Sequence, residues 1–108
     1  MEEIKNALEQ IAEEEYIRAN KKFPLFNSDH EGQAVIEEEM IEVNEEYYKT
    51  QANFHQLKAA VFNDNETEKI INAEKIRKYA LNTCAELVQV IAMCDKFVIS
   101  KAKREVQE

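Results

Sequence analysis

Residues 84–99 read CAELVQVIAMCDKFVI, and this stretch decides the fold class. If it is helical, apolar side chains fall on nearly every side, which is typical of a buried helix. The apolar residues form two sets at helical spacing. One set is Ala80, Cys84, Leu87, Ile91, Cys94 and Val98, and the other is Tyr79, Val90, Met93 and Phe97. A helix with two apolar faces needs neighbours on two sides, so the stretch predicts a helical bundle.

The composition also indicates an all-α protein. The chain has 108 residues with only one Gly and one Pro, which leaves few tight turns for a β fold. This length corresponds to one domain, so we expect residues 1–108 to form a single all-α domain. Apolar spacing predicts three helices, over about 2–21, 30–62 and 66–103, with a kink near 78–82 left open.

Helix boundaries can be read from turn and capping residues. Phe23-Pro24 is expected to end the first helix, because the residue before a proline avoids the α conformation. Ser28 followed by Glu31, and Asn65 followed by Glu68, are typical of helix starts.

Each of the first two helices is expected to carry an apolar stripe. Along the second helix the stripe is Ile36, Met40, Val43, Tyr47, Phe54, Leu57 and Val61, and along the first it is Ile4, Leu8, Ile11 and Ala12.

The charge of the chain excludes some classes of function. Fourteen basic and 22 acidic residues give a net charge of −8, which disfavours nucleic-acid binding and a polybasic membrane-surface helix. We expect no signal peptide, because residues 1–5 lack a basic and an apolar region, and no membrane span, because no apolar run is long enough to cross a bilayer. Cys84 and Cys94 lie too far apart on one helix for a disulfide, so we expect buried thiols in a soluble, cytoplasmic protein.

Carboxylates gather along one edge of the second helix. Glu39, Glu42 and Glu46 lie close to the apolar stripe instead of opposite it, and Glu38 lies beside Glu42 one turn earlier, at spacings where like charges repel. A bound cation would remove this cost, whereas the simpler interpretation is a charged flank of an acidic protein. On the third helix Glu86 lies in an apolar face with Gln89 one turn later, and it needs either a metal or a cationic partner on another helix. Oxygen donors of this kind suit Mg²⁺ or Mn²⁺.

Two motifs then resemble a known family. Residues 28–36 read SDHEGQAVI and are followed by Glu38-Glu39 and Glu42, while residues 86–93 read ELVQVIAM. Together these stretches resemble the two motifs of MazG-like proteins, all-α nucleoside triphosphate pyrophosphatases, and in particular their short phage and prophage members. The matching stretches, about 28–48 and 84–98, cover roughly a third of the chain.

The resemblance implies a Mg²⁺-dependent cleavage of a nucleoside triphosphate between its α and β phosphates. It implies that Glu39, Glu42 and Glu86 are metal ligands and that Glu38, with Glu39, is catalytic. Gln89 stands where the family has an Asp, so it would ligate through its amide oxygen without adding charge. His30 and Lys96 are the candidate substrate-binding residues.

The sequence therefore predicts a MazG-like long-helix bundle with a four-helix core completed by dimerisation, because three helices cannot cover both apolar faces of the third. The expected partners are a nucleoside triphosphate and a second copy of the chain, with no nucleic acid and no membrane. Two alternatives stay open: a protein that binds nucleotide or metal without turnover, and a non-catalytic interaction module in which Glu86 is salt-bridged.

Overall fold

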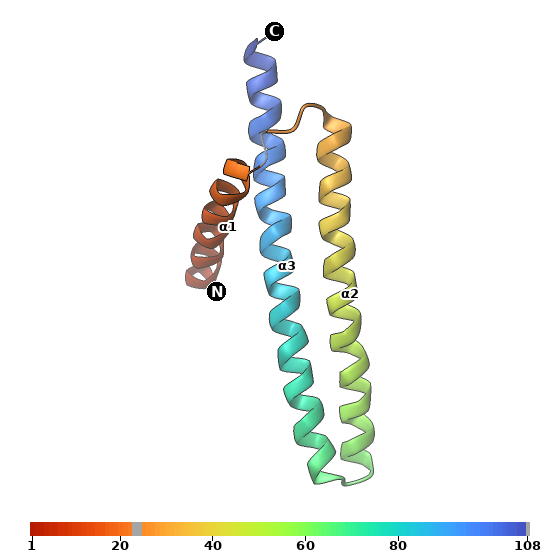
Figure 1. Ribbon diagram of the computed structural model, residues 1–108. Coiled ribbons are helices and arrows are strands. Elements are labelled where there is room, and N and C mark those ends of the chain that lie inside the picture. The colour runs from red at the N-terminus through yellow and green to blue at the C-terminus, as the bar shows by residue number, and fades with distance from the viewer. Residues whose placement is uncertain (23–24, 108) are drawn as a thin grey trace. The chain divides into compact units, whose positions relative to one another are not determined.

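The computed structural model describes residues 1–22 and 25–107, and the secondary-structure elements in these residues are all helices (Figure 1). Three helices follow one another: α1 over Glu2–Lys22, α2 over Asp29–Phe62 and α3 over Glu66–Gln107. The all-α prediction is confirmed in this part of the chain, and α3 continues beyond the expected end at Lys103. The predicted stop at Phe23-Pro24 lies outside the described residues. None of the described helices combines the length and apolar character needed to cross a lipid bilayer.

Ser28 caps the start of α2, as its sequence predicts. The backbone N–H of Glu31 donates to Ser28 Oγ at 3.1 Å, and this satisfies one of the amides that the first turn leaves without a helical partner. The Glu31 carboxylate accepts a hydrogen bond from the backbone N–H of Asn27 at 3.2 Å, one residue before the cap. Asp29 also begins the helix one residue earlier than expected, because the cap itself is Ser28.

A tight turn at residues 63–65 joins α2 to α3. Asp64 adopts the left-handed conformation with φ of 55°. The N–H of Asn65 donates to Ala60 O at 2.9 Å and that of Asp64 to Val61 O at 3.2 Å, which is the Schellman ending of a helix. Asn65 Oδ1 then accepts from the N–H of Glu68 at 3.1 Å, so the predicted cap of α3 is confirmed.

The chain divides into two compact units by its contacts. The first unit contains Met1–Met40 and Leu87–Glu108, and its core is formed by Phe26, Ala92 and Met93. Gly32 permits a close approach there, since a Cβ at this position would lie 2.5 Å from Phe97 Cδ2 and 3.0 Å from Phe26 Cδ2. The partly buried residues around this core are Tyr16, Ala19, Val35, Ile36 and Phe97.

The second unit, Ile41–Glu86, is an antiparallel hairpin of α2 and α3 (Figure 1). Its less exposed positions recur at alternating steps of three and four residues, which is the spacing of a coiled-coil seam. On α2 these positions are Val43, Glu46, Thr50, Asn53, Leu57 and Ala60, and on α3 they are Lys69, Asn72, Ile76, Tyr79, Thr83 and Glu86.

Polar side chains in this seam bond to the backbone of their own helix. Thr50 Oγ1 donates to Glu46 O at 3.1 Å and Asn53 Nδ2 to Lys49 O at 2.8 Å. On α3, Asn72 Nδ2 donates to Glu68 O and Thr83 Oγ1 to Tyr79 O in the same manner. Because each donor finds a carbonyl four residues earlier, the seam accommodates hydroxyl and amide groups without partners across the hairpin.

Several apolar positions differ from the predicted faces. Along α2, Met40, Tyr47, Phe54 and Val61 are about half exposed, whereas Ile36, Val43 and Leu57 turn inward. The physical reason is that the apolar residues of α2 form two rows along the helix, here called its two apolar columns, and only one of these columns can face α3. Other predicted core residues are exposed as well, namely Ile4, Ile11, Cys84, Leu87, Ile91, Cys94 and Val98. The expectation of buried thiols was therefore wrong.

Candidate metal centre

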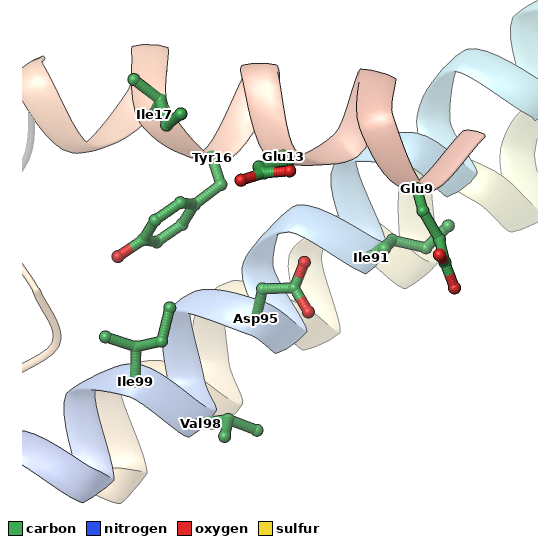
Figure 2. Close-up of a pocket in the computed structure, with 8 residues that line it drawn as sticks. All are labelled: Glu9, Glu13, Tyr16, Ile17, Ile91, Asp95, Val98 and Ile99. Atoms are coloured by element: carbon green, nitrogen blue, oxygen red, sulfur yellow. The ribbon is translucent and has the colours of Figure 1, made fainter. Parts of the chain in front are cut away.

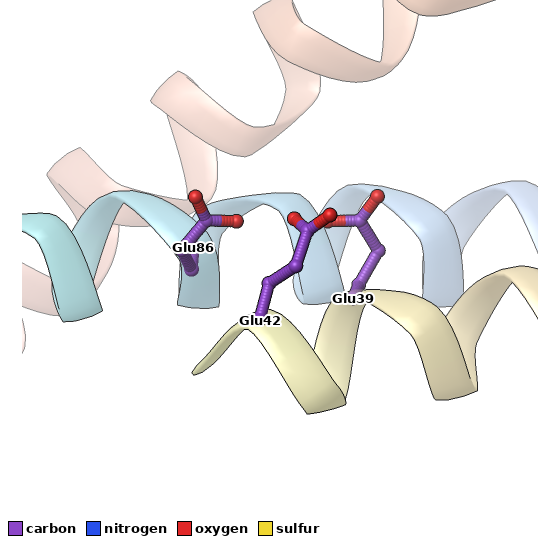
Figure 3. A group of neighbouring side chains, drawn as sticks. All are labelled: Glu39, Glu42 and Glu86. Carbon is purple, nitrogen blue, oxygen red and sulfur yellow. The ribbon is translucent and has the colours of Figure 1, made fainter. Parts of the chain in front are cut away.

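Three carboxylates from α2 and α3 approach one another. Glu42 and Glu86 both belong to the hairpin unit, and Glu39 lies three residues before Glu42 on the same continuous helix. One oxygen of each carboxylate lies within 4.8 Å of the other two, and Figure 3 shows the three groups turned toward a common space. Glu39 and Glu86 are half-buried and Glu42 is exposed. These are the three residues that the sequence motifs single out as carboxylate ligands.

The donor set can be tested against the ion that it would hold. Mg²⁺ binds oxygen octahedrally at about 2.0–2.1 Å, so neighbouring ligands on one ion are about 3 Å apart and opposite ligands about 4.2 Å apart. Of three ligands on one ion at least two pairs are neighbours, so separations of up to 4.8 Å need a contraction of up to about 2 Å, which rotation of the long Glu side chains can supply. Hard oxygen donors fit Mg²⁺ or Mn²⁺, and the residues present fit such an ion.

Gln89 is engaged with α1 in the first unit. Its Nε2 donates to Glu15 Oε1 at 2.9 Å, and Glu15 also forms an ion pair with Arg18. The hydrogen bond from Gln89 is the main reason why the pKa of Glu15 lies below its ordinary value, with Arg18 contributing to the same effect. Glu15 was missed in the sequence, although it continues the inward spacing of Leu8 and Ala12 on α1.

The other acidic candidates of α2 have different surroundings. Glu38 is exposed on the surface of its helix. Glu46 belongs to the hairpin seam, where it forms an ion pair with Lys49 at 3.2 Å and accepts a hydrogen bond from Asn82 Nδ2 at 3.3 Å. Glu46 is therefore a structural residue of the hairpin, while Glu38 is free to face solvent.

Lys96, a candidate substrate-binding residue, lies in the first unit against Phe26. Only 4% of the residue is exposed, and its Nζ lies 4.6 Å from the centre of the Phe26 ring. Burial lowers the pKa of Lys96, and the nearby charge of Glu31 opposes part of this effect. An aromatic face stabilises a cation that has lost much of its water.

His30, the other substrate-binding candidate, is exposed at the start of α2. It lines a cavity of about 380 Å³ in the first unit together with Asp29, Lys101 and Arg104. Asp29 accepts from Lys101 Nζ at 3.1 Å and from Arg104 at 2.5 Å, and these two donors hold the pKa of Asp29 below its ordinary value. The positive charges near His30 are thus already neutralised in part by Asp29.

A larger hollow of about 540 Å³ opens between α1 and α3 in the first unit (Figure 2). Its walls mix carboxylates with apolar side chains, and Tyr16 lies among them. The lining residues are Glu9, Glu13, Tyr16, Ile17, Ile91, Asp95, Val98 and Ile99. None of the predicted site residues lines it.

Comparison of the chain with protein-family models, with curated proteins and with solved structures finds no match.

Proposed function

We propose that the chain is a Mg²⁺-dependent nucleoside triphosphate pyrophosphohydrolase of the MazG-like superfamily. The observation that supports this proposal most strongly is the approach of Glu39, Glu42 and Glu86 within 4.8 Å of one another. Glu39 and Glu42 come from one motif and Glu86 from another, 44 positions beyond Glu42 in the printed sequence. A resemblance based on sequence thus agrees with an independent feature of the fold.

In the proposed reaction, water attacks the α-phosphorus and the bond to the oxygen that bridges to the β-phosphorus breaks. The products are the nucleoside monophosphate and pyrophosphate, which leaves with the bridging oxygen. Mg²⁺ supplies neutralisation of the polyphosphate charge and polarisation of the reacting phosphorus. Glu39, Glu42 and Glu86 would hold the ion, and Glu38 with Glu39 would orient the attacking water and accept its proton.

His30 and Lys96 are proposed to contact the nucleotide. His30 is accessible at the start of α2, where backbone amides and the helix dipole favour an anion. The ammonium of Lys96 lies over Phe26, so contact with a phosphate would require this side chain to leave the ring.

Binding of nucleotide or metal without turnover is the second candidate function, and one contact favours it. Gln89 occupies the position of an acidic family residue and gives its amide N–H to Glu15 on α1. A site with three carboxylates and a neutral fourth residue holds a metal less tightly than a site with four charges. A non-catalytic protein-interaction module is the remaining alternative.

We also propose that the protein is a cytoplasmic homodimer or higher homo-oligomer with a four-helix core. Exposed apolar residues on α3, among them Leu87, Ile91 and Val98, support association because a second copy would cover them.

The decisive experiment is an assay of pyrophosphate release from a panel of NTPs and dNTPs in the presence of Mg²⁺. We expect release from at least one substrate, with equimolar monophosphate, and none after chelation of the metal. Binding of nucleotide or Mg²⁺ by calorimetry without release would select the second candidate. If neither pyrophosphate release nor binding of nucleotide or Mg²⁺ is detected, the non-catalytic protein-interaction module is the remaining candidate.

A further inference from the structure

The outward side of α2 in the hairpin unit carries an apolar ladder with a seven-residue repeat. The ladder consists of Ile41, Tyr47, Tyr48, Phe54, Val61 and Phe62, and His55 completes its second column. Each of these six side chains is about half exposed or more, up to 72% for Tyr48 and 90% for Phe62. Contiguous exposed apolar residues of this kind mark interaction surfaces, and a repeat of seven is typical of helices that pair in a left-handed supercoil.

Polar residues occupy the middle of the same side in a regular order. Asn44, Gln51 and Lys58 are also seven residues apart and alternate with the apolar pairs along the helix. At 100° per residue they fall between the two apolar columns. A partner for this face must therefore present apolar and polar side chains in the same alternation.

Apart from Phe62 at its end, the ladder is symmetric about Gln51. Tyr48 and Phe54 are each three residues from it, Tyr47 and His55 four, and Ile41 and Val61 ten. When two copies of α2 cross antiparallel at Gln51, each of these apolar residues therefore meets an apolar residue or His55 of the other copy. A two-fold interface has this property, because residue i contacts residue j and j contacts i.

The charges select the same orientation. In the antiparallel arrangement Lys58 of one copy lies opposite Asn44 and beside Glu45 of the other. In a parallel arrangement Lys58 would face Lys58 and Glu45 would face Glu45, and such like-charge pairs are unfavourable.

A shallow hollow gives the ladder a place for a large side chain. A cavity of about 360 Å³ lies near the end of α2 and is lined by Phe54, Leu57, Lys58, Val61 and Phe62. In the antiparallel arrangement Tyr48 and Ile41 of the second copy lie opposite Phe54 and Val61, at this hollow. Tyrosine in an apolar pocket is a frequent anchor of interfaces.

We infer that the outward face of α2 binds the same face of a second copy of this chain, antiparallel and centred on Gln51. This inference deepens the proposed homo-oligomeric state by adding a surface on α2 to the exposed apolar residues of α3, and it does not depend on the proposed enzymatic activity.

Disulfide cross-linking of the full chain tests the orientation. The exposed Cys84 and Cys94 are first replaced by Ser, and Gln51→Cys or Lys58→Cys is added to this background. After mild oxidation we expect Gln51→Cys to form a covalent dimer, because its two copies meet at the axis. Lys58→Cys alone is expected to remain monomeric on a non-reducing gel, since its two copies are about 20 Å apart along the helix at 1.5 Å per residue. When Lys58→Cys is mixed with Asn44→Cys, we expect a disulfide-linked heterodimer of the two variants, because these positions lie opposite each other in the antiparallel arrangement.

Two results would overturn the inference. One is self-linking of Lys58→Cys at least as efficient as that of Gln51→Cys, which would indicate a parallel or unspecific contact. The other is unchanged association of Phe54→Glu by light scattering, because this exposed residue lies within the ladder. If Phe54→Glu still forms a dimer, the proposed oligomer is retained and only the assignment of its interface to this face of α2 is refuted. Pyrophosphate release tests the proposed activity separately.

Discussion

Three carboxylates within 4.8 Å of one another repel in the absence of a cation, so Glu86→Gln has two opposite effects. We expect pyrophosphate release to fall below detection, because the site loses a charged ligand. Without metal, the melting temperature should rise or stay level, since one repelling charge has been removed. Thermal melts with and without Mg²⁺ measure both effects, and Glu37→Gln on the exposed side of α2 is the matched control. A large destabilisation of metal-free Glu86→Gln would indicate a structural ion pair instead, because breaking a buried pair costs about 3–5 kcal/mol.

Position 89 can be tested through its contact with α1. Gln89→Asp replaces the amide donor by a carboxylate facing Glu15, so we expect a lower melting temperature without metal. If residue 89 belongs to the metal centre, Mg²⁺ restores the stability and binds more tightly than to the parent chain. The double variant with Glu15→Gln removes the new repulsion and serves as the control. Stability that Mg²⁺ does not restore in Gln89→Asp would remove this position from the site.

Gly32 sets the distance between α2 and the core of the first unit. In Gly32→Ala the new Cβ would lie 2.5 Å from Phe97 Cδ2, so the Phe97 ring must shift. Overpacking costs about 1–3 kcal/mol, and the better helix propensity of Ala returns up to about 1 kcal/mol. We expect a net loss of roughly 1 kcal/mol by chemical denaturation. Adding Phe97→Leu should make the Gly32→Ala change neutral or favourable, and a loss that persists would contradict the steric explanation.

At the scale of elements, Asp29 connects the start of α2 with the last turns of α3. Lys101 and Arg104 hold its pKa below the ordinary value, so the folded state binds this proton more weakly than the unfolded state. The resulting stabilisation is present above about pH 4 and is lost as the pH falls through the lowered pKa. We expect the melting temperature of Asp29→Asn to fall less steeply than that of the parent chain on acidification. Glu15, whose pKa is also lowered, should leave part of the acid sensitivity in place. Identical pH profiles would show that the contacts of Asp29 do not contribute.

Local signals predicted the helices well because their causes are local. Ser28 and Asn65 accept the amide bonds that their side-chain chemistry suggests, and the helix bounds agree to within a few residues. The carboxylate spacing of Glu39 and Glu42 predicted a shared direction for the same reason.

The packing of the faces could not be predicted, because it depends on contacts between distant residues. Both apolar columns of α2 repeat at helical spacing, and no local property shows that Val43 turns inward while Tyr47 stays exposed. Thr50 and Asn53 occupy the seam because they bond to their own backbone, a possibility that apolar periodicity ignores. The bond from Gln89 to Glu15 spans 74 positions and has no local signature.

At the scale of the whole molecule, exposed apolar area predicts association. On α3, Leu87 is 44% and Val98 66% exposed, in addition to the ladder of α2. Light scattering at micromolar concentration should give a mass of at least twice 12.6 kDa. If the α3 face contributes, Leu87→Glu with Val98→Glu will weaken association, because burial of these side chains would then require desolvation of two charges. Ile70→Glu is the control, since Ile70 is 60% exposed on the same helix but belongs to the hairpin unit, away from Leu87 and Val98 along α3. A stable monomer of the parent chain would show that both faces remain in water, and the four-helix core would have to be abandoned.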